Sequence, residues 1–244
     1  MKKLISYPLT VLYFIALVLC LLIFHPIQWI CFNLFGYQAH KKSVDYLNLS
    51  LQSCAYLLFS KYSVTNRELI PKDVPIIFVA NHQSMYDIIG IIWFMRDWHP
   101  KFISKIELGK GIPSVSYNLN HGGSVLIDRK DPKQALPAIK SMAEYIEKYK
   151  RSAVIFPEGT RSKDGNPKRF SENGLKILAK YAPNAYIVPI SINNSWKMLE
   201  HGNFPMGIGL NLKFTVHEPM AVKDYPFGEL FEKTEKAIVE GIKN

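Results

Sequence analysis

The chain carries no Asp, Glu, Lys or Arg between Leu4 and Phe35, and this uncharged run constrains the fold more than any other feature. About 20 apolar residues are enough to cross the hydrocarbon core of a bilayer, and Leu4–Phe24 reaches that length. Pro26 follows directly after His25 and predicts a break in the helix. The run therefore predicts a membrane-attached N-terminus rather than an ordinary soluble helix.

The charges beside the run favour a helical hairpin over a single crossing. Ile27–Phe35 is too short to span a bilayer. Lysines stand at both ends, at positions 2, 3, 41 and 42, and positive charge is kept on the cytoplasmic side of a membrane. Both ends are therefore expected on one face, with the hairpin entering one leaflet. No A-x-A-like cleavage site follows the run, so we expect it to be retained rather than removed as a signal peptide.

The sequence divides into a membrane-embedded hairpin over residues 1–40 and an α/β domain over residues 41–244. Apolar spacing of three and four predicts a helix over residues 41–70 that bridges the two parts. Beyond it, short apolar runs alternate with helical patterns, which is typical of a mostly parallel central sheet flanked by helices. The predicted strands are Ile76–Ala80, Lys101–Ser104, Ser124–Asp128, Ala153–Phe156, Ala185–Ile192 and Asn211–His217. The predicted helices are Ser84–Phe94, Asp131–Tyr149, Ser171–Tyr181 and Phe227–Ile242.

A histidine and an aspartate follow the first predicted strand. His82 comes just after Ile76–Ala80, at the carboxyl edge of the sheet, where open α/β proteins bind ligands. Asp87 lies five residues later, and a turn between strand and helix can bring its carboxylate to the imidazole. A histidine oriented in this way is a candidate general base. Ser84 and Asp87 also form an S-x-x-D capping box, so a purely structural role for Asp87 stays open.

Two groups could lose a proton to this base. Ser84 is the internal candidate, and it would make the protein a serine esterase. No G-x-S-x-G elbow surrounds it, and its position favours capping of the next helix. The hydroxyl of a bound substrate is the better candidate.

A second polar cluster, FPEGTRS, occupies residues 156–162 after another predicted strand. Arg161 suits a phosphate because its planar guanidinium binds two oxygens at once. Glu158 can be read as its ion-pair partner, and Gly159 as a residue with positive φ or one that allows close approach of a ligand.

Two further cations follow predicted strands, Lys105 and Arg129. Each alone is typical of a solvated surface charge. If the strands are parallel, however, Lys105, Arg129 and Arg161 all emerge near His82.

The net charge of +10 beside so much apolar sequence suits anionic lipid or a phosphorylated substrate. Nucleic acid is not expected as a partner, because the sequence has no compact Lys/Arg run, zinc-finger spacing or RNA-binding aromatic signature.

Taken together, these motifs resemble the glycerolipid acyltransferase family, and particularly its bacterial 1-acyl-sn-glycerol-3-phosphate (lysophosphatidic acid) acyltransferases. Four blocks occur in the family's order between about residues 75 and 192. They are N-H-x4-D at residues 81–87, FISKIEL with GGSVLIDR ending at Arg129, FPEGTRS, and the strand IVPI at residues 187–190.

The resemblance implies transfer of a fatty acyl group from acyl-CoA or acyl-carrier protein to the sn-2 hydroxyl of lysophosphatidate, giving phosphatidate. It implies His82 as the base, Asp87 as its orienting acid, and backbone N–H groups near the start of the 84–94 helix as donors to the oxyanion. It assigns Lys105, Arg129 and Arg161 to the phosphate, and Glu158, Gly159 and Thr160 to the acceptor site. It implies no metal and no cofactor, and it places the protein on the cytoplasmic face of the inner membrane.

Alternatives remain open at this point. The acceptor can be glycerol 3-phosphate, another lysophospholipid or a lyso-aminolipid. A membrane-bound serine esterase acting through Ser84 and a non-catalytic lipid-binding protein come from other classes.

Overall fold

Strand β2 (Ile76–Ala80) is the centre of the structure, and all five of its residues are buried. The computed structural model describes residues 2–128 and 130–243, and across these residues eight strands form one sheet. The strand order is β1-β7-β6-β2-β5-β3-β4, and β8 pairs with β6. The other strands are β1 (Lys61–Thr65), β3 (Pro100–Lys105), β4 (Val125–Ile127), β5 (Ser152–Ile155), β6 (Tyr186–Asn193), β7 (Asn211–Val216) and β8 (Met220–Ala221). Strands β6, β2, β5, β3 and β4 run parallel, so their carboxyl ends share one edge.

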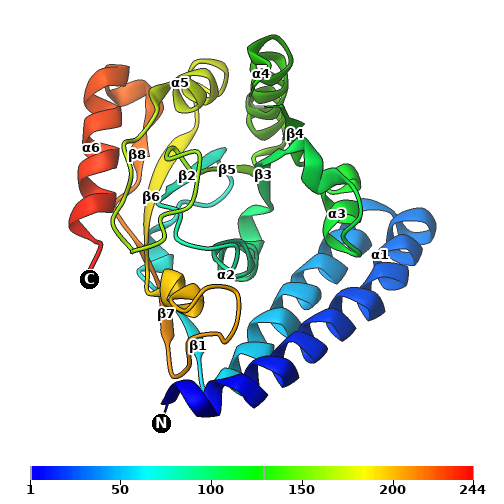
Figure 1. Cartoon of the computed structure of the whole chain (residues 1–244). Helices are drawn as coiled ribbons and strands as arrows, with labels where there is room; N and C mark the ends of the chain where they lie inside the picture. The colour runs from blue at the N-terminus through cyan, green and yellow to red at the C-terminus, as the bar shows by residue number, and fades with distance from the viewer. Residues whose placement is uncertain (1, 129, 244) are drawn as a thin grey trace.

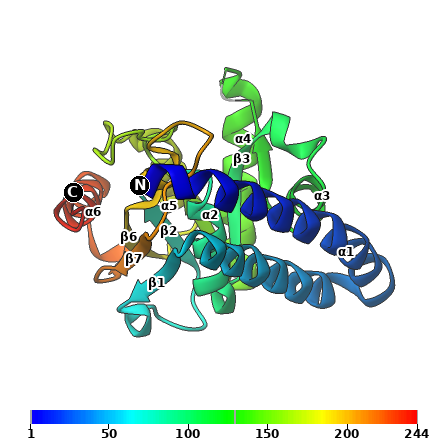
Figure 2. The same ribbon diagram turned by 60° about the horizontal axis from the view of Figure 1, so that its bottom comes forward.

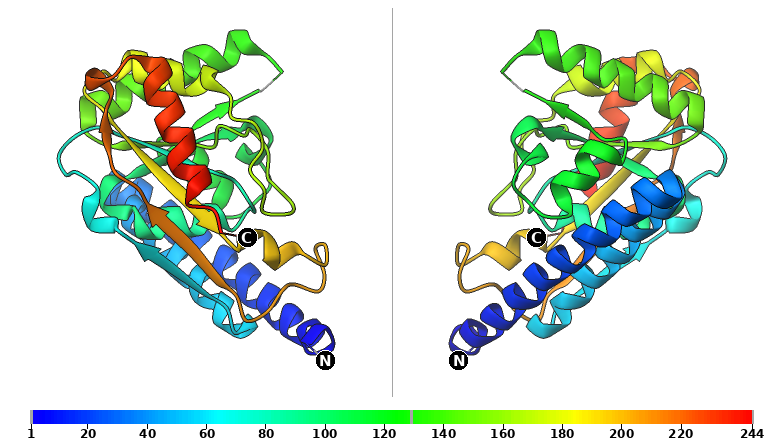
Figure 3. Two further views of the ribbon diagram at one scale, coloured as in Figure 1. Left: turned by 90° about the vertical axis from the view of Figure 1, so that its left-hand side faces the viewer. Right: turned by 90° about the vertical axis from the view of Figure 1, so that its right-hand side faces the viewer.

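Helices cover both faces of this sheet (Figures 1 and 3). They are α1 (Lys2–Cys54), α2 (Asp87–Phe94), α3 (Val115–His121), α4 (Pro132–Tyr149), α5 (Glu172–Tyr181) and α6 (Phe227–Glu240). The predicted fold class, a mostly parallel α/β sheet flanked by helices, is confirmed. Short 3₁₀ turns join several elements, and one of them, η5 (Ser195–Leu199), follows β6.

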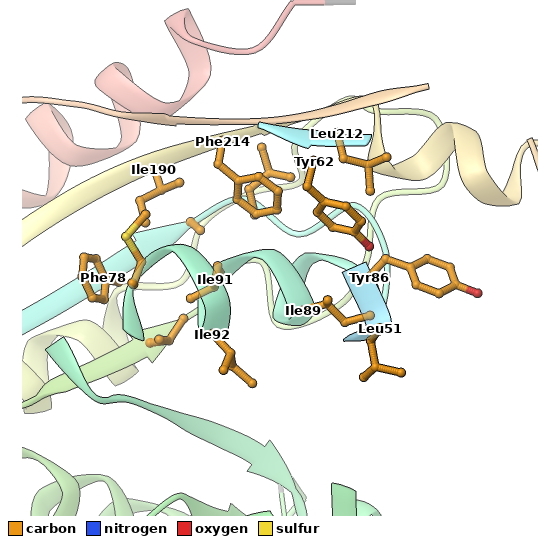
Figure 4. Close-up of a cluster of buried hydrophobic side chains, with 14 of the residues drawn as sticks. Leu51, Tyr62, Phe78, Tyr86, Ile89, Ile91, Ile92, Ile190, Leu212 and Phe214 are labelled. Atoms are coloured by element: carbon orange, nitrogen blue, oxygen red, sulfur yellow. The ribbon is translucent and has the colours of Figure 1, made fainter. Parts of the chain in front are cut away.

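Alternation along β2 divides the core into two clusters. Ile76, Phe78 and Ala80 face a cluster shared with α1 and α2, whereas Ile77 and Val79 face one shared with α4, α5 and α6. This period of two is what a strand buried on both faces requires. Figure 4 shows α2 packed between Phe214 of β7 and Tyr62 of β1 on one side and Leu51 of α1 on the other, with Ile89 and Ile92 on the side of Leu51.

Helix α1 is a hairpin of two helical arms, residues 2–35 and 37–54, joined by a kink at Gly36 (Figures 1 and 2). Gly36 has φ 75° and ψ −170°, a conformation essentially confined to glycine. The Sγ atoms of Cys20 and Cys54 lie 3.8 Å apart, which shows that the arms run side by side. The structure therefore contains a hairpin, but not the predicted one: the whole uncharged run Leu4–Phe35 lies in the first arm, and the second arm is the segment 37–54, which carries Lys41 and Lys42.

The break predicted at His25-Pro26 is wrong, because the helix continues through Pro26. Polar groups from the loop before α3 bind this part of the helix. Ser114 Oγ donates to the carbonyl of Leu21 (2.6 Å), and the Ser114 amide donates to Nδ1 of His25 (3.1 Å). A proline is tolerated in an apolar helix when neighbours satisfy the groups around it.

The outer face of the first arm remains apolar and exposed. The helical stretch Lys2–Leu58, which includes the kink at Gly36, has an 18-residue window with mean hydropathy 2.5, of which 11% is buried, so length and composition allow it to cross a membrane. The inner face is part of the protein core, where Tyr13 is buried beside Tyr86. Division of the chain at residue 40 stays a prediction.

The helix predicted over residues 41–70 is correct only in its first half. The helix ends at Cys54, and residues 61–65 form β1, which pairs in parallel with β7. Position 62 is buried beside Phe214, so packing at the sheet edge overrides the helical spacing. Helix α3 and strand β8 are also absent from the prediction. The remaining strands and helices agree with prediction to within three residues at each end.

Candidate active site

His82 and Asp87 come together at the carboxyl end of β2. His82 Nδ1 lies 2.8 Å from Asp87 Oδ2, and Asp87 is fully buried. An ionised carboxylate only accepts hydrogen bonds, so this contact favours the tautomer with the proton on Nδ1, and a neutral imidazole in that tautomer has its lone pair on Nε2. The His82 side chain is 14% exposed, which leaves the imidazole accessible from outside. The predicted pairing is confirmed as geometry.

Asp87 also holds the backbone that precedes α2. The same oxygen, Oδ2, accepts the amides of Gln83 (2.7 Å) and Ser84 (2.9 Å). The two roles considered for Asp87, orientation of the histidine and satisfaction of backbone amides, therefore coexist. Two hydrogen bonds expected of the S-x-x-D capping box are present, because Asp87 accepts the Ser84 amide and Ser84 Oγ accepts the Tyr86 amide, although α2 itself begins at Asp87.

Ser84 has no access to a substrate. It is fully buried, and its hydroxyl accepts the amide of Tyr86 (3.1 Å) and faces Asp87 Oδ1 (3.4 Å). A hydroxyl held in this way is bonded to the carboxylate rather than to the imidazole. The geometry argues against a serine nucleophile at this position.

Three amide groups just before α2 are unavailable as donors to an oxyanion. The amides of Gln83 and Ser84 donate to Asp87, and the amide of Tyr86 donates to Ser84 Oγ. The expectation that this segment stabilises an oxyanion is therefore wrong for these three groups.

Glu158 ties the second motif to the histidine. Its Oε1 accepts the amide of His82 (2.7 Å), and its Oε2 accepts the amide of Lys168 (2.8 Å). Only 8% of the residue is exposed, and this burial raises the pKa of its carboxyl, while the two amides act in the opposite direction. The ion-pair interpretation of Glu158 is thus replaced by a structural one, in which its carboxylate fixes the backbone of His82.

The loop after β5 lies directly against His82. The Ser162 amide donates to the His82 carbonyl (2.7 Å), and the Phe156 ring stacks on the imidazole with centroids 4.1 Å apart. Gly159 has φ 66°, which confirms the expected positive φ, and Thr160 is exposed. Whether Gly159 and Thr160 contact an acceptor stays a prediction.

The structure places two of the three predicted phosphate ligands at this edge of the sheet. Arg161 is exposed and adjoins Ser162, the residue bonded to the His82 carbonyl. Lys105 is exposed at the last position of β3, in register with Ile127 of β4. Arg129 lies outside the described residues.

Two buried polar residues of this site, Ser195 and Gln83, were not identified from the sequence. Ser195, just beyond the end of β6, donates its hydroxyl to Asp87 Oδ1, and its amide donates to Gln83 Oε1 (3.1 Å). Ser195 follows the end of β6 as His82 follows the end of β2, and this position in the sequence was a signal for it. Within residues 2–128 and 130–243, no group of three or more His, Cys, Asp and Glu side chains has the arrangement of a metal site.

An open parallel sheet that carries a carboxylate-bound histidine at its carboxyl edge defines an α/β protein with the parts of a general base. Residues 61–193 match the family model described as Acyltransferase, which is more than half of the chain. The chain belongs to this acyltransferase family.

The curated relatives share this assignment. The chain is 31% identical over 163 residues to 1-acyl-sn-glycerol-3-phosphate acyltransferase LPAT1, chloroplastic, from Arabidopsis thaliana, covering 66% of this chain and 44% of that protein. It is 39% identical over 127 residues to the 1-acyl-sn-glycerol-3-phosphate acyltransferase of Helicobacter pylori, covering 49% and 51%. The match thus spans about half the length of these relatives.

One solved structure matches nearly the whole chain. The crystal structure of the 1-acyl-sn-glycerophosphate (LPA) acyltransferase PlsC from Thermotoga maritima has a TM-score of 0.82 at 26% identity, and the match covers 99% of this chain and 96% of that one. The resemblance stated from the motifs is therefore confirmed at the level of family and fold.

Proposed function

We propose that the protein transfers a fatty acyl group from acyl-CoA or acyl-carrier protein to the sn-2 hydroxyl of 1-acyl-sn-glycerol 3-phosphate, forming phosphatidate. The observation that carries the proposal is the 2.8 Å contact between His82 Nδ1 and Asp87 Oδ2. It lies at the carboxyl edge of the sheet, where Arg161 and Lys105 also lie. The names of the curated relatives and of the matching crystal structure support the same acceptor.

The chemistry needs only a positioned base and a held acceptor. Nε2 of His82 takes the proton of the sn-2 hydroxyl as the oxygen attacks the thioester carbonyl. Asp87 stabilises the imidazolium that forms. When the tetrahedral intermediate collapses, the C–S bond breaks, and the imidazolium returns its proton to the departing thiolate. No covalent enzyme intermediate is required.

Cations beside the base suit the phosphate of the acceptor. Arg161 supplies a planar fork for two phosphate oxygens, and Lys105 supplies a point charge from the neighbouring strand end. Arg129 is proposed as a third ligand on the strength of its motif alone. Glu158 contributes by holding the backbone of His82, and Gly159 and Thr160 form the wall of the acceptor site.

Membrane attachment through α1 places this site where acceptor and product reside. The exposed apolar side chains of the first arm, including Leu19, Ile23 and Trp29, suit the acyl region of one leaflet. The lysines at positions 2, 3, 41 and 42 favour the cytoplasmic face of the inner membrane.

The test is an acyl-transfer assay of the purified full chain in mixed micelles, with lysophosphatidate, other lysophospholipids, glycerol 3-phosphate and a lyso-aminolipid, each with both thioester donors. We expect phosphatidate from lysophosphatidate, and loss of about 10²–10⁴-fold in rate for His82→Ala. Asp87→Asn keeps the shape of the buried side chain and should lose a comparable factor.

Arg161→Ala should mainly raise KM for the acceptor, because it removes binding present before the chemistry. Arg169→Ala is the matched control, an exposed arginine farther along the same loop. Acylation only of phosphate-free acceptors would overturn the assigned substrate. Unchanged rates in His82→Ala would overturn the proposed reaction and favour a lipid-binding role.

A further inference from the structure

Asp87 Oδ2 and Oδ1 have different sets of partners. Oδ2 receives His82 and two adjacent amides, all from the segment that immediately precedes α2. Oδ1 receives the hydroxyl of Ser195, which is 108 residues away in sequence and fully buried, and faces Ser84 Oγ at 3.4 Å. Oδ1 is therefore bound chiefly by a side chain brought in by the fold.

The backbone around Ser195 fixes the direction of this hydroxyl. Asn194 has φ 69° and turns the chain between β6 and η5, and its Nδ2 donates to the carbonyl of Asn211 (3.0 Å). The Ser195 amide donates to Gln83 Oε1, and Gln83 belongs to the segment that carries His82. Ser195 is thus held at two points to the same few residues whose geometry sets the base.

We propose that Ser195 is a positioning residue for the acyl-transfer base, acting on His82 through Asp87. This inference rests on the proposed function, in which His82 is the general base. The hydroxyl draws negative charge toward Oδ1 and stops rotation of the carboxylate, so that Oδ2 stays directed at His82 Nδ1. Without that donor the carboxylate holds a proton on the imidazole more strongly, and the base is lost to protonation at a higher pH.

The charged and titratable groups around this pair include Glu158, from the loop after β5, Tyr62, from β1, and Arg161, next to the residue bonded to the His82 carbonyl. Removal of the Ser195 hydroxyl leaves them in place. A change in pH dependence is therefore attributable to the lost donor.

The experiment compares Ser195→Ala with Ser152→Ala over pH 5.5 to 9, using the full chain in mixed micelles with lysophosphatidate. Ser152 is equally buried and donates one hydrogen bond to the carbonyl of Trp98 (2.8 Å), at the opposite edge of the sheet. In Ser195→Ala we expect kcat to fall about tenfold, KM for the acceptor to stay within about twofold, and the acid limb of kcat/KM to move up by about one pH unit. Ser152→Ala should keep the wild-type profile.

An acid limb in Ser195→Ala at the wild-type position would overturn the inference, whatever happens to stability. If Ser195→Ala does not fold, Ser195→Thr and Ser195→Cys replace it. Threonine keeps the hydroxyl and should preserve the limb, whereas the weaker thiol donor should move it; identical limbs in these two variants count against the role. His82→Ala separates the proposed function from the role of Ser195. Full activity of His82→Ala refutes His82 as the general base. If His82→Ala is inactive and the acid limb of Ser195→Ala is unshifted, only the positioning role of Ser195 is refuted.

Discussion

The substitution Glu158→Gln tests whether the glutamate of the second motif acts on the structure of the site. Both carboxylate oxygens accept backbone amides, from His82 at 2.7 Å and from Lys168 at 2.8 Å. A glutamine has the same shape but only one acceptor oxygen. Its NH₂ group must therefore face one of the two amides, donor against donor.

The magnitude follows from these two bonds. Leaving one buried amide unsatisfied costs about 1–3 kcal/mol, and the surviving bond loses its charge assistance. The removed carboxylate was itself penalised by burial, as the raised pKa of Glu158 indicates, and this offsets part of the loss. We expect a net destabilisation of about 2 kcal/mol, which lowers Tm by about 4–8 °C for a chain of this length.

Activity should fall more than stability. The His82 amide is one of the affected groups, and a displacement of about 1 Å at a reacting group can cost about 100-fold in rate. We therefore expect kcat for lysophosphatidate acylation to drop at least tenfold, with a smaller change in KM.

The assay measures Tm by circular dichroism and kcat in the same micelles. Glu232→Gln, an exposed glutamate on α6, is the matched control. The reasoning is refuted if Glu158→Gln is as stable and as active as Glu232→Gln. A large rise in acceptor KM with unchanged kcat would instead favour direct contact of Glu158 with the acceptor.

Two further predictions concern packing and pH. Gly90→Ala puts a Cβ 2.3 Å from the Phe214 ring and should destabilise the protein by about 1–3 kcal/mol. The control Gly228→Ala places its Cβ in open space at the start of α6 and should be neutral or slightly stabilising. Thermal unfolding measures both variants, and equal Tm values would contradict the prediction. Burial lowers the pKa of Lys101 from 10.5 to about 7, with Arg151 acting in the same direction. Between pH 7 and 10 the unfolded chain therefore binds more protons than the folded one. The cost of burying Lys101 is largest near pH 7 and becomes smaller as the pH rises, so the stability of the protein rises with it. The Tm of Lys101→Met minus that of the wild type should be most positive near pH 7 and decline toward pH 10, and a difference independent of pH would contradict the assignment.

The hairpin shows how one local signal outweighed another. Pro26 predicts a break because proline removes a helical hydrogen bond. The chain instead turns at Gly36, whose φ and ψ are accessible to glycine and to almost nothing else. The helix continues through the proline, and Ser114, far along the chain, binds the Leu21 carbonyl and the His25 ring on the turn before it.

The residues before α2 combine the two roles that the sequence left open for Asp87. The S-x-x-D pattern predicts that Asp87 binds the Ser84 amide, and it does, but the same carboxylate oxygen also binds His82 and the Gln83 amide. The helix begins at Asp87, three positions after the predicted start. The local pattern does not record the additional contact with the imidazole.

The amino-acid sequence by itself determined the buried strands, the apolar N-terminal run and the order of the motifs, because burial and backbone preference are expressed in local periodicity and local residue type. It also placed His82 and Asp87 close enough in the chain to meet. Only the tertiary structure decided that Glu158 binds the His82 amide and that Ser195 binds Asp87, 76 and 108 residues away. Those bonds depend on where separate strand ends converge, and periodicity within each segment carries no record of which loop will lie against which.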